Sequence, residues 1–295
     1  MSEPAITVTL LGTGSPRPHP RRFSQSTLVE AGGHRLLIDC GRGAVHRLGQ
    51  LEVPLGEVGP VFLTHLHSDH VIALADLWIT GWHLPPTWRT GPFEVYGPSG
   101  TRRMLDNLEA AYSVDRYVRI ADEGLSTDGI ALDVTDIAEG PVWERDGVAV
   151  EAIRVEHWPG PDAPASFGYR ISHAGRSVVF SGDTRKSEHL AEAARGADLF
   201  VHEVAITPPD APTGDAGPQG ARILGHHTSP QQAGEVFSIA QPRLAVYSHI
   251  IQWRGTTDDD LLAQTSETYD GRVVVGEDLM RITIGDEVDL TRQPA

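Results

Sequence analysis

The chain opens with short apolar runs that are separated by turns rich in glycine and proline. Residues 6–11, 27–29 and 35–38 are extended apolar segments of this kind. Runs of this length between glycine, proline and polar residues are typical of β-strands. The pattern therefore predicts an opening series of antiparallel strands.

After residue 60 the pattern changes to strand, loop and helix. Residues 61–63 and 93–96 are short apolar runs that predict buried strands. Residues 71–82 form an apolar segment of helical length, and 101–112 carry apolar side chains at helical spacing. This part of the chain therefore predicts helices that lie beside strands.

The second half repeats this alternation with a different sequence. It predicts strands at 148–155, 168–172, 177–180, 199–205, 243–247 and 272–275, and helices at 187–195, 230–239 and 258–268. The helix at 230 has Ser229 as its N-cap and Pro230 at its first position, a favoured combination. No long repeat or composition shift marks a boundary, so we predict one domain over residues 1–295 with an α/β fold, two sheets covered by helices.

The composition is that of a folded, acidic protein. Of the 295 residues, 40% are hydrophobic and 22% are charged, which excludes disorder as the dominant state. The formal net charge of −16 works against binding a nucleic-acid backbone, although a local basic patch could still exist. The single cysteine, Cys40, excludes an intramolecular disulfide framework and a cysteine-rich zinc module.

The sequence shows no pattern that directs a protein to a membrane. The first residues lack the basic stretch and apolar run of a secretory signal. No apolar run approaches the roughly 20 residues that are needed to span a bilayer. We therefore expect a cytoplasmic protein with no membrane partner.

The strongest chemical signal is the sequence Thr-His-Leu-His-Ser-Asp-His at residues 64–70, directly after the predicted strand at 61–63. Side chains alternate between faces in an extended chain, so His65 and His67 point the same way and can bind one metal ion. Asp69 and His70 follow where the chain turns into the next helix, and they could serve a second ion.

One loop cannot complete a catalytic metal site, because a catalytic zinc takes three protein ligands and keeps an open position. His157, Asp183 and His249 follow or end predicted strands, where α/β folds place functional side chains. His157 is a candidate third ligand for the first ion. Taken alone, each residue would more often be an ordinary loop residue, but their joint placement favours a metal site.

Further short segments give the chain a resemblance to a known family. They are Leu-Gly-Thr-Gly at 11–14, Asp-Cys-Gly at 39–41, Ser-Gly-Asp-Thr at 181–184, His-Glu at 202–203, His-Thr-Ser at 227–229 and Ser-His at 248–249. With residues 64–70 and His157, this set resembles the metallo-β-lactamase fold, specifically its ribonuclease Z and arylsulfatase-like branch, over nearly the whole chain. The resemblance implies a four-layer αββα sandwich, a two-metal site at one edge of the sheets, and a homodimer.

The resemblance also implies a role for each ligand. It assigns His65, His67 and His157 to one zinc, Asp69, His70 and His249 to the other, and Asp183 as the bridge between them. Manganese or iron would tolerate the same ligand set. Class B lactamases place a cysteine among the second-metal ligands, and this chain has no cysteine near these motifs, which argues against β-lactam hydrolysis as the main activity.

Two features suit the hydrolysis of an ester. Residues 166–171, Ser-Phe-Gly-Tyr-Arg-Ile, are similar to a signature of this branch. The pair Glu203 and His227 looks like its proton-delivery arrangement, in which Glu203 orients His227 so that the imidazole protonates the leaving oxygen. A metal-bridging hydroxide, held and oriented by Asp69, would attack the ester.

The sequence also departs from ribonuclease Z proper. The stretch Asp-Cys-Gly-Glu-Gly-Thr-Gln of that enzyme reads Asp-Cys-Gly-Arg-Gly-Ala-Val at 39–45, and Ile-Ile-Gln-Trp at 250–253 replaces its aromatic-Ser-x-Arg run. The basic arm that grips transfer RNA is missing as well. Residues 114–147 contain nine acidic and three basic residues, a segment that would repel RNA.

These departures favour a dinuclear zinc hydrolase that acts on a small anionic substrate, a phosphodiester or a sulfate ester. The alternative is a transfer-RNA 3′-processing endoribonuclease, whose substrate is a nucleic acid. A lactonase or thioesterase would use the same metals on an acyl centre. A non-catalytic member would bind metal without turnover, and the intact ligands and His227 argue against it. Residues 206–222, rich in proline, glycine and aspartate, are either a lid or an ordinary exposed loop.

Overall fold

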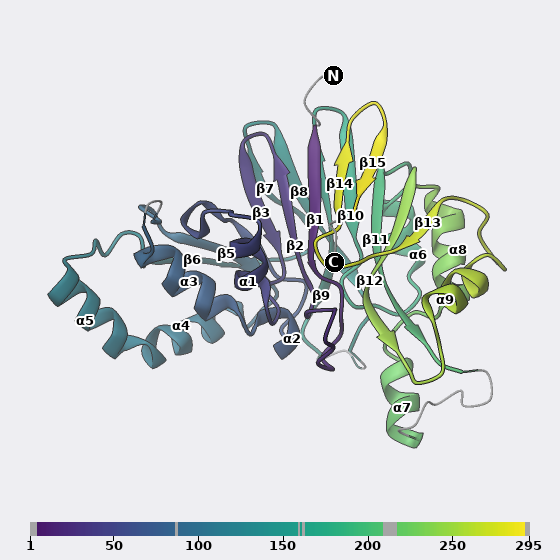
Figure 1. The fold of residues 1–295 in the computed structure, drawn as a ribbon, viewed down its shortest axis with the longest axis horizontal. Coiled ribbons are helices and arrows are strands. Elements are labelled where there is room, and N and C mark those ends of the chain that lie inside the picture. The colour runs from purple at the N-terminus through teal and green to yellow at the C-terminus, as the bar shows by residue number, and fades with distance from the viewer. Residues whose placement is uncertain (1–4, 86–87, 159, 161–162, 209–216, 293–295) are drawn as a thin grey trace.

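Two β-sheets pack face to face, and helices cover their outer faces (Figure 1). The computed structural model describes residues 5–85, 88–158, 160, 163–208 and 217–292. The expected α/β fold with two helix-covered sheets, the four-layer αββα sandwich, is therefore confirmed.

The first sheet has eight strands in the order β15-β14-β1-β2-β3-β4-β5-β6. Strands β1, β2 and β3 pair antiparallel, as the opening apolar runs predict, and β3 to β6 pair parallel. The strands are β1 (Ile6–Gly12), β2 (Ser26–Ala31), β3 (His34–Ile38), β4 (Val61–Phe62), β5 (Phe93–Gly97), β6 (Leu132–Asp136), β14 (Arg281–Ile284) and β15 (Val288–Thr291).

The second sheet has seven strands in the order β13-β12-β11-β10-β9-β8-β7. Strands β10 to β13 pair parallel, whereas β7 to β10 pair antiparallel. The strands are β7 (Gly140–Arg145), β8 (Val148–Val155), β9 (Ser166–His173), β10 (Arg176–Phe180), β11 (Leu199–Ile206), β12 (Leu244–Gln252) and β13 (Val273–Val275).

The helices divide between the two outer faces. Those that follow strands of the first sheet are α1 (Ala44–Gln50), α2 (Ser68–Val71), α3 (Leu74–His83), α4 (Thr101–Ala111) and α5 (Ser113–Glu123), with a short 3-10 helix at Leu55–Glu57. Those of the second half are α6 (Glu188–Ala193), α7 (Gly217–Leu224), α8 (Pro230–Ala240) and α9 (Asp258–Thr265). None of the described helices combines the length and the apolar character that a bilayer crossing requires.

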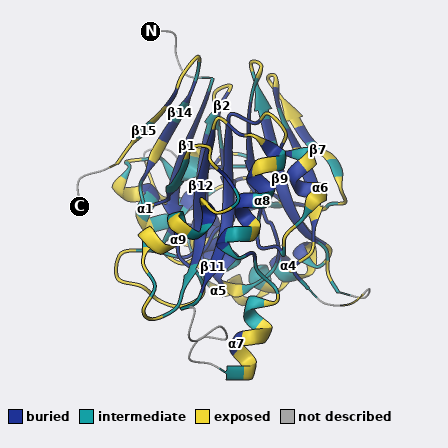
Figure 2. Cartoon of the chain, turned by 90° about the vertical axis from the view of Figure 1, so that its right-hand side faces the viewer, coloured by how far each residue is buried: buried dark blue, intermediate teal, exposed yellow. Residues whose placement is uncertain are grey.

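Three apolar clusters fill the three interfaces between the four layers. The central cluster joins the two sheets and includes Phe62 and Tyr169. A second cluster packs α1, α3 and α4 on the first sheet and includes Trp82, and a third packs α6, α8 and α9 on the second sheet and includes Phe237. Figure 2 shows the buried residues concentrated along the strands. Burial of these apolar side chains is the main force that holds the layers together.

Two local features differ from the sequence-based expectations. The helix expected at 71–82 is divided, because α2 ends at Val71 and α3 begins at Leu74. The backbone nitrogen of Ala73, in the turn between them, donates a hydrogen bond to the carbonyl of Cys40, 3.0 Å away. Strands β6, β7, β14 and β15 were not expected, because strands this short or this polar carry a weak signal; β6, β7 and β15 are edge strands, and β14 lies next to one.

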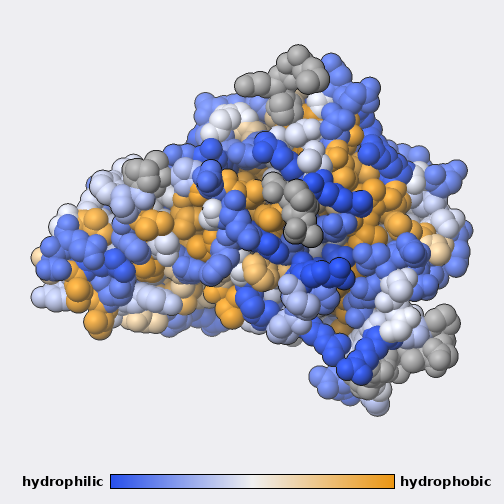
Figure 3. All heavy atoms as spheres, in the orientation of Figure 1, coloured by the Kyte–Doolittle hydropathy of each residue, from blue (hydrophilic) through white to orange (hydrophobic). Residues whose placement is uncertain are grey.

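Helix α5 was also not expected, and it lies at the far end of the molecule from α8 and α9 (Figure 1). Val114, Tyr117 and Val118 are exposed on it, and apolar side chains are visible at this end of the molecule in Figure 3. Exposed apolar groups at helical spacing are typical of interaction surfaces. The homodimer remains a prediction.

Candidate metal centre

Loops from both sheets meet at one edge of the sandwich and bring together all seven predicted metal ligands. Residues 64–70 follow β4 and run into α2, while His157 follows β8 and Asp183 follows β10. The expectation for His249 needs one correction, because β12 continues to Gln252 and His249 therefore lies inside the strand. The ligand atoms still fall into neighbouring groups, each within 4.8 Å.

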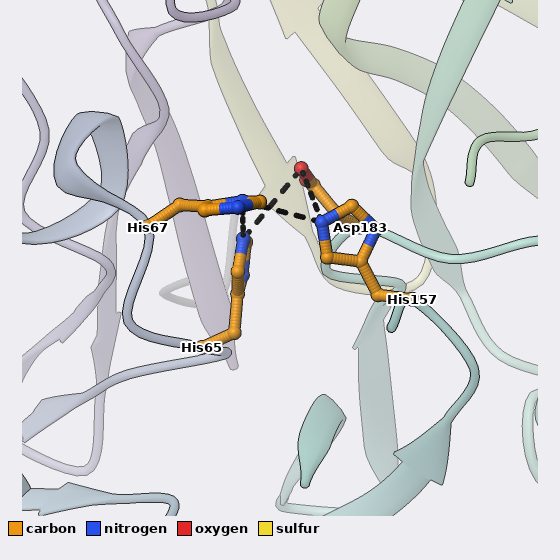
Figure 4. A group of neighbouring side chains, drawn as sticks. All are labelled: His65, His67, His157 and Asp183. Atoms are coloured by element: carbon orange, nitrogen blue, oxygen red, sulfur yellow. Dashed lines mark hydrogen bonds and ion pairs between the residues drawn. The ribbon is translucent and has the colours of Figure 1, made fainter. Parts of the chain in front are cut away.

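The first group contains three histidines and one aspartate (Figure 4). The Nε2 atom of His65 lies 2.9 Å from Nδ1 of His67, and Nε2 of His157 lies 3.2 Å from the same nitrogen. Asp183 Oδ2 lies 3.7 Å from His65 Nε2 and 3.9 Å from His157 Nε2. Ligand atoms about 2.0 Å from a tetrahedral ion are about 3.3 Å apart, so these spacings fit one ion.

The second group contains Asp69, His70 and His249. Asp69 Oδ2 lies 3.6 Å from His70 Nε2 and 3.3 Å from His249 Nε2. The two oxygens of Asp183 also face this group, with Oδ1 3.5 Å from His70 Nε2 and Oδ2 3.3 Å from His249 Nε2. Asp183 therefore lies between the two groups, as a bridging carboxylate would.

Some of the buried metal-ligand atoms among the described residues have no hydrogen-bond partner, and bound cations would supply one. Within the described part of the chain, His70 Nε2 and Asp183 Oδ1 are buried and have no hydrogen-bond partner. Buried polar atoms nearly always have one, so such orphans indicate a missing ion or water. The donor set fits bound metal cations.

The electrostatics of His65, His157 and Asp183 favour the forms of these side chains that bind a metal. Burial lowers the pKa of His65 well below its usual value and lowers the pKa of His157 to about 4, so both imidazoles are neutral at pH 7. Burial alone would raise the pKa of Asp183, but its interactions with the neighbouring His249 and His70 side chains outweigh burial and hold the pKa well below its usual range. Neutral imidazoles and ionised carboxylates are the forms that coordinate a metal.

Backbone geometry aims two of the ligands. In β12 the register with β11 shifts at His249, which is an extra residue with a φ of 44° and therefore forms a bulge. Bulges re-aim side chains next to functional sites. Before Asp183, Gly182 has a φ of 59°, and a Cβ there would lie 2.5 Å from the carbonyl oxygen of Phe167. Only glycine allows this close approach.

Asp39, directly after β3, holds the loop at residues 64–70 in place through two contacts. Its Oδ1 accepts a hydrogen bond from the backbone nitrogen of Thr64 at 2.8 Å, and its Oδ2 lies 2.7 Å from Nδ1 of His70. A carboxylate on the second nitrogen of a ligand histidine fixes its tautomer and orientation. The Asp-Cys-Gly segment entered the resemblance without a role for Asp39, although its place directly after a predicted strand was the same signal that marked the ligands.

Trp158 and Tyr169 support the same loop, and the sequence did not predict this. The ring centroid of Trp158 lies 4.2 Å from that of His67 and 5.0 Å from that of His157. The hydroxyl of Tyr169 donates a 2.6 Å hydrogen bond to the carbonyl of Leu63, the residue before the loop. The sequence signature at 166–171 could have indicated a role for Tyr169. For Trp158 the only indication in the sequence was its position directly after His157.

The expected proton-delivery pair also reaches the centre. Nδ1 of His227 lies 3.1 Å from Oε1 of Glu203, and its ring centroid lies 5.2 Å from that of His157. The same Glu203 oxygen accepts hydrogen bonds from the backbone nitrogens of Thr184 and Thr228, which fix the carboxylate. Burial lowers the pKa of His227, but the charge and hydrogen bond of Glu203 raise it by more, to about 9.

His226, which the sequence left without a role, contributes its backbone. Its carbonyl accepts a 3.1 Å hydrogen bond from Nδ1 of His157, and this leaves Nε2 of His157 free for a metal. Of the expected lid or loop at 206–222, residues 209–216 lie outside the described part of the chain. The described helix α7 projects from the body of the molecule just before His226 (Figure 1).

Replacing Asp39 with asparagine is expected to weaken metal binding about 10- to 100-fold, because His70 loses the carboxylate that orients it. Zinc titration against a chromophoric chelator measures this affinity. Asp198→Asn is the matched control, since Asp198 is a buried carboxylate that accepts a hydrogen bond from Ser177 and pairs with Arg243 elsewhere in the fold. Equal zinc affinity in the Asp39 and Asp198 variants would contradict the role of Asp39.

Several known proteins are similar to this chain. The family model described as "Anti-Pycsar protein Apyc1" matches residues 6–213. The ribonuclease Z of Mycolicibacterium gilvum (strain PYR-GCK) is 35% identical over 280 residues, 95% of this chain and 96% of that protein. Among solved structures, the metallo-β-lactamase fold protein YhfI from Bacillus subtilis superposes with a TM-score of 0.72 at 17% identity, over 94% of this chain and 98% of that one. Human tRNase Z, short form, gives a TM-score of 0.66 at 23% identity, over 95% of this chain and 99% of that one.

Proposed function

We propose that this chain, which belongs to a family of metal-dependent hydrolases with the metallo-β-lactamase fold, is an endoribonuclease that processes the 3′ end of precursor transfer RNA. The family includes the ribonucleases Z and is described by the Apyc1 model. The observation that carries the proposal is the His227–Glu203 pair beside the two ligand groups. A ribose oxygen leaving at neutral pH needs a proton, and this pair stands where it can supply one. The relatives named ribonuclease Z support RNA as the substrate.

We propose two zinc ions for the two ligand groups, with manganese or iron as ions that the same nitrogen and oxygen donors would accept. Two cations held this way lower the pKa of water and neutralise charge on the phosphate. His65, His67 and His157 would hold the first ion. Asp69, His70 and His249 would hold the second, with Asp183 shared.

The remaining steps belong to side chains of the chain itself. Asp69 lies 3.3 Å from His249 and has a lowered pKa: burial would raise it, but the hydrogen bond from His249 and the charge of His70 outweigh burial. As a carboxylate it orients the attacking water. Glu203 holds Nδ1 of His227, which leaves Nε2 to protonate the leaving oxygen.

A small phosphodiester is the second candidate substrate, and the charge of the chain favours it. The net charge of −16 and the acidic segment 114–147 oppose binding of a large polyanion. The structure assigns that segment to α5, β6, β7 and the turns around them. Of the other candidates, a sulfate ester or an acyl substrate would use the same centre, and a non-catalytic role would use only its metal binding.

One experiment separates these substrates. Zinc-loaded protein is assayed on precursor transfer RNA by gel, and in parallel on a chromogenic phosphodiester, phosphomonoester, sulfate ester and lactone, each with a chelator-treated control. We expect chelator-sensitive cleavage at the acceptor end of the RNA. Turnover of the small phosphodiester with intact RNA would favour the second candidate. Activity on the lactone alone, or none on any substrate, would contradict the proposal.

A further inference from the structure

Two adjacent hollows lie between the metal centre and the start of α4. The first, of about 300 Å³, is lined by residues that include Arg154, His157, Trp158 and Arg185. The second, of about 620 Å³, is lined by residues that include Gly100, Arg102, Arg103 and Asp136. Ala163 and Pro164 line both hollows, so the two are adjacent, and together they are called the α4 groove.

The α4 groove is basic although the chain is acidic. Four arginines and two carboxylates, Asp136 and Glu156, line it. Asp136 is already engaged, because its carboxylate accepts hydrogen bonds from the backbone nitrogens of Gly100 at 3.1 Å and Arg102 at 3.0 Å. The groove therefore carries a local excess of positive charge in a chain whose net charge is −16.

Several of these arginines are free to bind an anion. In the part of the chain that is described, Arg103 and Arg154 are exposed and form no ion pair. Arg185 forms no ion pair there either, but its Nε donates a 2.6 Å hydrogen bond to the carbonyl of Gly225. Arg102 is less available, since it donates a 2.9 Å hydrogen bond to the carbonyl of Val134 and lies 3.7 Å from Asp106. Solvated arginines release counterions when they contact phosphates, and this release drives binding.

We propose that the α4 groove binds the phosphate backbone of single-stranded RNA next to the bond that is cleaved. The inference rests on the proposed function, because it takes the scissile phosphate to lie at the metal centre. His157 is both a predicted metal ligand and a wall of the first hollow, so the neighbouring phosphates of such an RNA lie beside Arg185 and Arg154. The groove supplies a local basic surface although the net charge of the chain is negative. RNA binding therefore does not require a basic arm at 114–147.

The test measures RNA binding and small-ester turnover separately. The anisotropy of a short fluorescein-labelled single-stranded RNA is titrated with zinc-loaded enzyme at several salt concentrations, for wild type, Arg103→Gln, Arg154→Gln and the double variant. Arg281→Gln is the matched control, because Arg281 is an exposed arginine on β14, away from α4 (Figure 1). Turnover of bis(p-nitrophenyl) phosphate monitors the metal centre in each protein.

Each groove variant is expected to bind RNA about fourfold more weakly at about 0.15 M salt, and the double variant about 15-fold more weakly. The slope of log affinity against log salt should fall by about 0.7 for each arginine removed. Small-ester turnover and the control variant should match wild type. RNA affinity unchanged in the double variant, or an equal loss in Arg281→Gln, would overturn the groove. Absence of wild-type turnover on every substrate would instead contradict the proposed function, and the binding data would still decide the groove.

Discussion

Replacing Asp183 with asparagine is expected to remove both metal ions and to reduce turnover to below about a thousandth of the wild-type rate. The two oxygens of Asp183 face both ligand groups, at 3.3 to 3.9 Å from four histidine nitrogens. An amide keeps the size of the side chain but removes the negative charge that two adjacent dications need between them. Metal content after dialysis, measured by mass spectrometry, and turnover of the small phosphodiester check the expectation.

Asp69→Asn is the contrasting variant, because Asp69 contacts only the second group. It should keep one ion per chain and lose the other, whereas Asp183→Asn should keep neither. Thermal unfolding of the metal-free proteins confirms that each variant folds. Two ions retained by Asp183→Asn, or identical metal contents for the two variants, would show that Asp183 does not bridge.

Replacing His227 with alanine is expected to slow cleavage of RNA by a factor of about 10² to 10⁴, the usual contribution of a general acid. The effect should depend on the leaving group. A ribose alkoxide must be protonated as it leaves, whereas a nitrophenolate is already a weak base and leaves without help. The same variant should therefore hydrolyse bis(p-nitrophenyl) phosphate within about tenfold of wild type.

The matched control for this variant is His226→Ala. His226 is next to His227 in the sequence. Its backbone carbonyl, which the substitution keeps, accepts the hydrogen bond of His157, and its ring centroid lies 6.0 Å from that of His157. Kinetics on both substrates should match wild type. A loss of equal size on both substrates in His227→Ala, with reduced metal content, would mean that His227 supports the metal centre and does not donate the proton.

The residues that meet at the candidate metal centre could be named from the sequence because their signals are local. The spacing of His65 and His67 places them on one face of an extended segment whatever the rest of the fold does. His157 and Asp183 each follow a strand that can be recognised from its own apolar run. The pairing of β1, β2 and β3 and the capping of α8 by Ser229 were predictable for the same reason.

Features that depend on two distant segments could not be predicted in this way. The bulge that aims His249 exists only because β12 pairs with β11 out of register, and register is a property of the pair. The contact of Asp39 with His70 needs β3 and β4 to lie side by side. The sequence of either strand alone does not determine the distance between Asp39 and His70.

The same division holds for charge and for the helix at the far end of the molecule. Composition determined that the chain is acidic. The tertiary structure decided that Arg102, Arg103, Arg154 and Arg185 line two adjacent hollows on either side of Ala163 and Pro164. The amphipathic pattern of α5 is present in its sequence, yet only the tertiary structure leaves Val114, Tyr117 and Val118 in solvent. Sequence periodicity records which side chains share a face, and the free energy of packing decides what that face meets.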